Sequence, residues 1–343
     1  MAQATNRNTT IDILKGIAII LVIYAHCIQF GSGSNYLKSL FYFNNQLFKF
    51  IYSFHMPLFM IISGYLFHFS IKNHSFKYNL NSRFIGLFVP IIVWQTIWIL
   101  LGDFHSLNNY SILYLLNSYL NTLWFITSVF LNSLIVLLCN KYAKDSLLLY
   151  SFIFFVSLFI PNYYGYNLYV FMLPYFLCGY FYNKAGGLKV MNNHNIGITE
   201  FVILVVLFFI LLYHYDINDY IYTSGTYIIR NHMISVSQIY TDFFRWGIGL
   251  IGSLCIILLI KLIFNNNAQL LVLRCLGIIG TRTMGLYIIS TYLFQYFNLL
   301  PVKGPSYTYY LIECIIVTLI SYLLTWLIEQ NNYSRKYMLG GRN

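Results

Sequence analysis

The run IDILKGIAIILVIYAHCIQFG, residues 11–31, decides the fold class of this chain. A helix that crosses the hydrocarbon core of a bilayer needs about 20 mostly apolar residues, and this run has that length. Further apolar runs of similar character lie at 49–70, 84–102, 120–139, 146–161, 168–183, 198–215, 243–264, 280–300 and 307–329. The sequence therefore predicts an all-α, polytopic integral membrane helical bundle of about ten transmembrane helices, built as a single membrane domain over 1–343.

The composition excludes the common soluble classes. Hydrophobic residues make up 59% of the chain and charged residues only 8%, whereas soluble domains carry about 25% charged residues. A net charge of +11 would suit a nucleic-acid partner, but the basic residues are scattered over short loops. We therefore expect a lipid bilayer as partner and no nucleic acid. The six cysteines stand singly, without a CxxC pair, which predicts neither a metal site nor a disulfide framework.

The charges of the loops predict the orientation. With an even number of spans both termini lie on one side, which carries 15 of the 20 Lys and Arg residues, while the other side carries five. Because short cytoplasmic loops are enriched in Lys and Arg, both termini are predicted to be cytoplasmic. The longest outer loop, about 216–242, suits substrate contacts; its charged and histidine residues are Asp216, Asp219, Arg230, His232 and Asp242.

Ionisable side chains inside the predicted spans are candidates for function, because an apolar environment makes them costly. Lys15 and His26 are eleven residues apart in the first span, so they share one helix face, about 16 Å apart along the axis. His55 lies at the same depth as His26 in the antiparallel second span, and the two histidines could face one cavity. The alternative is that each histidine only hydrogen-bonds a neighbouring helix, and that Lys15 only follows the charge bias of cytoplasmic ends.

The order of several short motifs resembles that of the acyltransferase family 3 membrane proteins, over about residues 9–329. The motifs are TIDILKG (10–16) followed by YAH (24–26), FHMPLF (54–59) with ISGYLF (62–67), RFIGLFVP (83–90), LWF (123–125), and LGIIG (276–280) with MGLY (284–287). The first two are specific together, whereas each of the others is weak alone. Three positions depart from the family pattern: Lys15 replaces the usual Arg, Thr283 the usual Ser, and Ser290 a late His.

This resemblance implies transfer of an acyl group, usually acetyl, from cytoplasmic acyl-CoA to a hydroxyl of a surface or lipid-linked glycan. It also implies a multi-pass protein of the bacterial plasma (inner) membrane. Acetyl-CoA or another acyl-CoA would be the donor substrate, with no bound cofactor. The residue roles implied are catalysis by His26 and His55, donor binding by Lys15, Arg83 and Arg282, and substrate binding by Trp124 and Tyr287.

Two other functions fit the same features. A polysaccharide or small-molecule transporter, or flippase, would also have about ten spans and intramembrane histidines, but we find no internal repeat of the kind common in transporters. A structural partner of a glycan synthesis complex is the second alternative. The sequence does not indicate the acceptor sugar, the acyl length or the oligomeric state.

Overall fold

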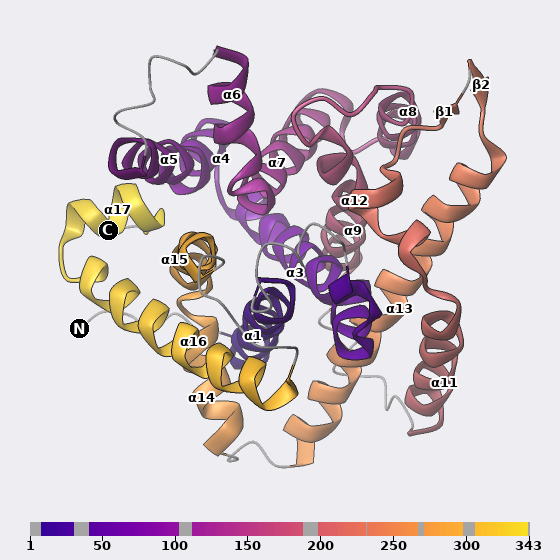
Figure 1. Cartoon of the computed structure of the whole chain (residues 1–343). Helices are drawn as coiled ribbons and strands as arrows, with labels where there is room; N and C mark the ends of the chain where they lie inside the picture. Colours follow the sequence, from indigo (N-terminus) through magenta and orange to yellow (C-terminus); the bar gives the residue numbers. More distant parts are fainter. Residues whose placement is uncertain are drawn as a thin grey trace. The chain divides into compact units, whose positions relative to one another are not determined.

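The computed structural model describes residues 8–30, 41–102, 112–187, 198–230, 232–266, 271–297 and 306–341. These residues are almost entirely helical, as Figure 1 shows, which confirms the all-α prediction. The strands in this part of the chain are the two-residue β1 (Ile229–Arg230) and β2 (Met233–Ile234), paired antiparallel. The chain folds as two compact units, each assembled from segments that are distant in sequence: unit 1 is 1–59, 194–215 and 248–326, and unit 2 is 60–193, 216–247 and 327–343.

Each of the ten predicted spans coincides with a helix. Among the described residues six helices are long and apolar enough to cross a membrane, or seven if one bent pair counts as a single span. The six are Thr9–Phe30, Gln46–Asn73, Phe76–Leu101, Trp124–Ala143, Val236–Ile263 and Tyr307–Glu329. Two shorter apolar helices, Leu147–Ser157 and Ile198–His214, also lie at predicted spans. The total of ten therefore stays a prediction.

Unit 1 is built around the first helix. Its elements are α1 (Thr9–Phe30), η1 (Phe41–Asn44), the first part of α3 (Gln46–Asn73), α11 (Ile198–His214), the second part of α13 (Val236–Asn266), α14 (Leu271–Gly280), α15 (Thr283–Phe297) and most of α16 (Tyr307–Glu329). α1 packs against both α14 and α15 (Figure 1). A Cβ atom at Gly16 would collide with the carbonyl oxygen of Leu276, and one at Gly280 with that of Asp12. Glycine thus lets the backbones of α1 and α14 touch.

The predicted span 280–300 coincides with α15, and the helix before it, α14, was not predicted. α14 and α15 meet at an angle of 77°, with Thr281 and Arg282 at the break. The N–H groups of these two residues donate to the carbonyls of Ile278 and Ile279, at 3.2 and 3.0 Å. Such short-range bonds tighten and end a helix. Gly280, the last residue of α14, is held against α1, so the chain turns where that contact is made.

Unit 2 holds the remaining elements. They are the second part of α3, α4 (Phe76–Arg83), η2 (Phe84–Phe88), α5 (Val89–Gly102), α6 (Ile112–Asn121), α7 (Trp124–Ala143), α8 (Leu147–Ser157), α9 (Tyr166–Lys184), η4 (Ile217–Asp219), α12 (Ile221–Ser224), β1, β2, the first part of α13, and α17 (Asn332–Leu339). α9 packs closely on α3, because a Cβ at Gly64 or Gly179 would collide with a carbonyl oxygen of the other helix. The Asn183 amide of α9 also donates to the Tyr65 carbonyl of α3, at 2.7 Å.

The third span begins earlier than the sequence predicts. Its helix starts at Phe76, where the Ser75 side chain caps it by accepting from the Tyr78 N–H at 3.3 Å. The helix then continues through a π turn, η2, into α5. Arg83 therefore lies inside a helix and not at its entry. The sequence also does not predict α17, which packs on α5 and whose Met338 carbonyl accepts from the Trp94 indole N–H at 2.8 Å.

Candidate active site

His26 lies on α1, five residues from its end, and is partly buried. Its Nδ1 is 3.1 Å from the side-chain Oε1 of Gln29, one helical turn later. An amide oxygen can only accept, so Nδ1 carries the hydrogen in this contact. The Nε2 of His26 then holds the unprotonated lone pair, and this nitrogen is the one that can take up a proton.

His55 is held in the same tautomer by a different partner. It is buried in α3, and its Nδ1 donates to the backbone carbonyl of Ile51 at 2.8 Å. The ring of Tyr52 packs edge-on against it, with centroids 4.8 Å apart. The Nε2 of His55 is therefore also a lone-pair nitrogen.

The two imidazoles belong to unit 1, where His26 lies on α1 and His55 on α3. Aromatic rings surround His26: Phe30 on α1 and Phe294 on α15 lie 5.7 and 5.6 Å from its centroid. These apolar neighbours lower the local dielectric beside the ring, which strengthens any charge interaction there. The structure thus places the two predicted catalytic histidines in the same compact unit.

Lys15 is paired within its own helix. Its Nζ lies 3.5 Å from Oδ1 of Asp12, and their side chains are only 19% and 10% exposed. The pair lies one turn into α1, next to the Gly280 contact with α14. A lysine held by a carboxylate offers a partly neutralised charge to an anionic donor, a feature that the sequence pattern does not reveal.

Arg282 and Tyr287 also lie in unit 1. Arg282 occupies the break between α14 and α15, where its guanidinium donates to the Tyr322 hydroxyl and lies 4.6 Å from the centre of that ring. Tyr287 is buried in α15, and its carbonyl accepts from the hydroxyls of Ser290 and Thr291, at 3.1 and 2.8 Å. Ser290, which stands where the family often has histidine, is thus engaged by its own helix.

Arg83 and Trp124 belong to unit 2. The Arg83 guanidinium lies 4.5 Å from the centre of the Phe67 ring. Trp124 is the first residue of α7 and is partly exposed. It lines a pocket of about 750 Å³ formed entirely by residues of unit 2.

Glu313 on α16 is a further candidate residue that the sequence motifs do not indicate. This side chain is only 7% exposed, and its Oε2 is buried without a hydrogen-bond partner among the described residues. The Cys27 thiol of α1, next to His26 in sequence, lies within hydrogen-bond reach of the carboxyl. The position of Glu313 inside the predicted tenth span could have identified it as a functional candidate, because ionisable groups are costly within a membrane.

The His, Cys, Asp and Glu side chains in the described part of the chain are dispersed. No group of three or more His, Cys, Asp or Glu side chains there is arranged to hold a metal ion. The cysteines in the described residues are free thiols. The site therefore offers imidazole, carboxyl, hydroxyl and cationic groups for chemistry.

Comparison with known proteins identifies the domain. The family model described as an acyltransferase domain matches residues 8–326. A nodulation protein NolL of Mesorhizobium japonicum (strain LMG 29417 / CECT 9101 / MAFF 303099) is 34% identical over 155 residues, which cover 43% of this chain and 39% of that protein. A nodulation protein NolL of Sinorhizobium fredii (strain NBRC 101917 / NGR234) is 42% identical over 93 residues, 27% of this chain and 25% of that protein. The matched segments thus span less than half of these relatives, and no solved structure matches the chain.

Proposed function

This chain belongs to the acyltransferase family 3, and from that premise we propose that it is a membrane O-acyltransferase. It transfers an acyl group, most simply acetyl, from cytoplasmic acyl-CoA to a hydroxyl of a surface or lipid-linked glycan. We place it in the bacterial plasma membrane, as a multi-pass protein. The observation that carries the proposal is the pair of histidines whose Nδ1 atoms donate to the Gln29 side-chain amide oxygen and to the Ile51 backbone carbonyl, leaving both Nε2 atoms as bases.

The chemistry follows from the position of the lone pair. Nε2 of His26 accepts the proton of the acceptor hydroxyl while that oxygen attacks the thioester carbonyl carbon. The new C–O bond forms the ester and the C–S bond breaks. The departing CoA thiolate takes the proton back from the imidazolium, so atoms and charge balance. His55, which has the same tautomer, orients the acceptor hydroxyl or stabilises the charge that develops during the proton transfer.

The cations of the chain supply the donor contacts in this proposal. Lys15 and Arg282 of unit 1 are assigned to the phosphates of CoA, and donor binding stays the sequence-based prediction for Arg83. Lys15 binds as a point charge and lacks the planar fork of arginine. Its pairing with Asp12 makes its grip weaker than that of the arginine that the family usually places there. Tyr287 is assigned to the acceptor side.

Release of free CoA thiol by the purified full-length protein tests the proposal. With acetyl-CoA and a glycan acceptor, the wild-type protein is expected to release thiol and to acetylate the glycan. His26→Gln keeps a side chain able to hydrogen-bond but cannot take the proton, so transfer should fall by about 10²–10⁴-fold. His214→Gln, at the exposed end of α11, is the matched control and should keep full activity.

Two results contradict this function. Transfer by His26→Gln close to the wild-type rate would make His26 a structural residue. A wild-type protein that moves glycan across the membrane but never releases thiol from acetyl-CoA would be a transporter.

A further inference from the structure

Unit 2 contains a pocket of about 750 Å³ where three segments meet. One is the junction of α6 and α7, the second is the loop around 162–168, and the third is the stretch 221–230. The loop charges predict all three on the side opposite the termini. These segments are far apart in sequence, so the pocket is a product of folding and not of one local turn.

Side-chain amides form much of the pocket wall and are held in place. Asn121 donates to the Oδ1 of Asn117, and the Asn167 N–H donates to the Oδ1 of Asn162 at 3.2 Å. Gly165, with φ +74°, allows the Asn121 amide to approach, because a Cβ there would collide with its oxygen. These asparagines are therefore fixed, and each amide offers both donor and acceptor atoms to a ligand.

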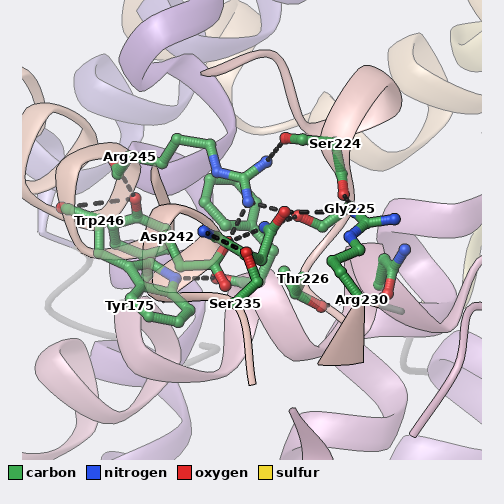
Figure 2. Close-up of polar contacts among 12 residues, drawn as sticks. Tyr175, Ser224, Gly225, Thr226, Arg230, Ser235, Asp242, Arg245 and Trp246 are labelled. Atoms are coloured by element: carbon green, nitrogen blue, oxygen red, sulfur yellow. Dashed lines mark hydrogen bonds and ion pairs between the residues drawn. The ribbon is translucent and has the colours of Figure 1, made fainter. Parts of the chain in front are cut away.

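A buried ion pair contacts the backbone of the third segment, residues 221–230, as Figure 2 shows. Arg245 pairs with Asp242, and both side chains are 2% exposed. The Arg245 guanidinium donates to the Gly225 carbonyl and, at 3.1 Å, to the Ser224 hydroxyl. The Gln238 amide donates to the same Gly225 carbonyl at 2.9 Å. A buried ion pair adds little net stability. We therefore infer that the pair of Arg245 and Asp242 positions the backbone of this part of the pocket wall.

Aromatic rings complete the wall. Trp124, Tyr164 and Tyr227 are partly exposed and line the pocket. Among the described lining residues there is no carboxylate, and the one cation is Arg230, whose Nη2 already donates to the Ser224 carbonyl and to Gln238, at 2.7 and 3.2 Å. This inventory does not suit the several phosphates of CoA, which call for clustered cations.

We propose that this pocket binds an uncharged saccharide of about two pyranose rings. The C–H face of a pyranose is apolar and packs on an aromatic ring, while its hydroxyls both donate and accept, as asparagine amides do. The volume lies within the range of small-ligand pockets, about 300–1,000 Å³. This inference rests on the proposed acyl transfer and deepens it, because it assigns the binding of the glycan acceptor to residues of unit 2.

Calorimetric titration of the full-length protein with cellobiose, maltose and N,N′-diacetylchitobiose tests the proposal without requiring acyl transfer. At least one disaccharide should bind with a millimolar Kd. Trp124→Ala, which removes the stacking ring, should weaken that binding by about tenfold, the loss expected for about 1.4 kcal/mol. Asn117→Ala, at an exposed position of the wall, should weaken it in the same direction. Trp326→Ala is the matched control, because Trp326 is 45% exposed on α16 and outside the pocket.

The outcomes separate this proposal from the enzyme function. Failure of all three disaccharides to bind, or unchanged binding by both pocket variants, would overturn the saccharide site. Sugar binding by His26→Gln at wild-type strength, with transfer lost, supports both proposals. Sugar binding by a wild-type protein that shows no transfer supports the pocket and defeats the enzyme function.

Discussion

At the scale of single residues, local helix geometry sets the chemistry of the two histidines. Gln29 lies three residues after His26, and the Ile51 carbonyl lies four residues before His55. Both spacings place the partner one turn away on the same helix face. Each imidazole is therefore oriented by its own helix, and the tautomer does not depend on how distant parts of the chain are arranged.

Glu313 offers a test of whether a costly residue has a function. Its Oε2 has no partner in the described part of the chain, and a buried unsatisfied polar atom costs about 1–3 kcal/mol. We expect Glu313→Gln to raise the thermal stability of the protein and to lower its transfer rate, because intramembrane acids that persist at such a cost are usually functional. A melting curve and a thiol-release assay on the same preparation measure both effects.

The matched control for this substitution is Glu200→Gln, at an exposed position in the first turn of α11, which should change neither quantity. A stabilised but fully active Glu313→Gln variant would contradict the functional assignment. An unchanged melting temperature would show that Oε2 is satisfied.

The sequence revealed His26 and His55 because a histidine within an apolar run stands out. Glu313 was missed because it lies only seven residues into α16, where an acid can equally be taken for an interfacial residue. Its proximity to Cys27 of α1 is a product of folding, which no pattern in one sequence shows. The pocket asparagines were missed for a similar reason: in an Asn-rich chain they read as ordinary loop residues until folding brings three segments together.

At the scale of helices, α1 depends on backbone contact with α14. Ala in place of Gly280 would collide with the Asp12 carbonyl, and overpacking of this kind costs about 1–3 kcal/mol. We expect Gly280→Ala to lower the melting temperature and to disturb the neighbouring pair of Lys15 and Asp12. Gly247→Ala is the control, since a Cβ there meets no atom within 4 Å and alanine favours a helix interior. Equal melting temperatures for the two variants would contradict the close contact.

Asp145 joins three helices of unit 2 at the turn between α7 and α8. Its carboxylate accepts from Lys184 at 2.5 Å, from the hydroxyls of Tyr180 and Tyr150 at 2.9 and 3.0 Å, and from Asn140 at 3.0 Å. Burial acts to raise the pKa of Asp145, but these hydrogen bonds outweigh it and hold the pKa below its usual value. A depressed folded-state pKa contributes stability above the pKa of the unfolded chain, and this stability is lost as the pH falls through the folded-state value.

The prediction for Asp145 is therefore a pH-dependent stability difference. Asp145→Asn should melt at a lower temperature than the wild type at neutral pH. The gap should narrow as the pH falls below about 4, the ordinary range of an aspartate pKa, because the wild-type carboxylate is then protonated. Thermal unfolding across a pH series measures the gap, and a gap that stays constant down to acidic pH would show that the charge of Asp145 contributes nothing.

Hydropathy predicted where helices lie, and it failed where helices break. All ten apolar runs coincide with helices, because each must satisfy its backbone hydrogen bonds internally within a bilayer. The bend between α14 and α15, the π turn at Phe84–Phe88 and the helix α17 were not predicted. These features depend on close contacts such as that of Gly280 with α1, which composition and periodicity do not encode.

At the scale of the whole molecule, the proposed reaction has a direction. The predicted topology puts Lys15 and Arg282 near the cytoplasmic face, where acyl-CoA is available, and the saccharide pocket segments on the outer face. His26 is predicted in the outer half of the first span. The acyl group of a cytoplasmic donor would then have to reach His26 beyond the middle of the membrane. The assignments of donor and acceptor residues therefore depend on the orientation of the chain.

Labelling with a membrane-impermeant thiol reagent tests that orientation in intact cells. In a variant whose native cysteines have been replaced and whose activity is retained, a cysteine at Ser75, before α4, should resist the reagent, because the loop charges place it in the cytoplasm. A cysteine at Asn218, in η4 of the long outer loop, should be labelled. Permeabilised cells provide the control, since both sites should then react. Labelling at Ser75 in intact cells would reverse the topology and place Lys15 and Arg282 on the outer side of the membrane, where cytoplasmic acyl-CoA could not reach them.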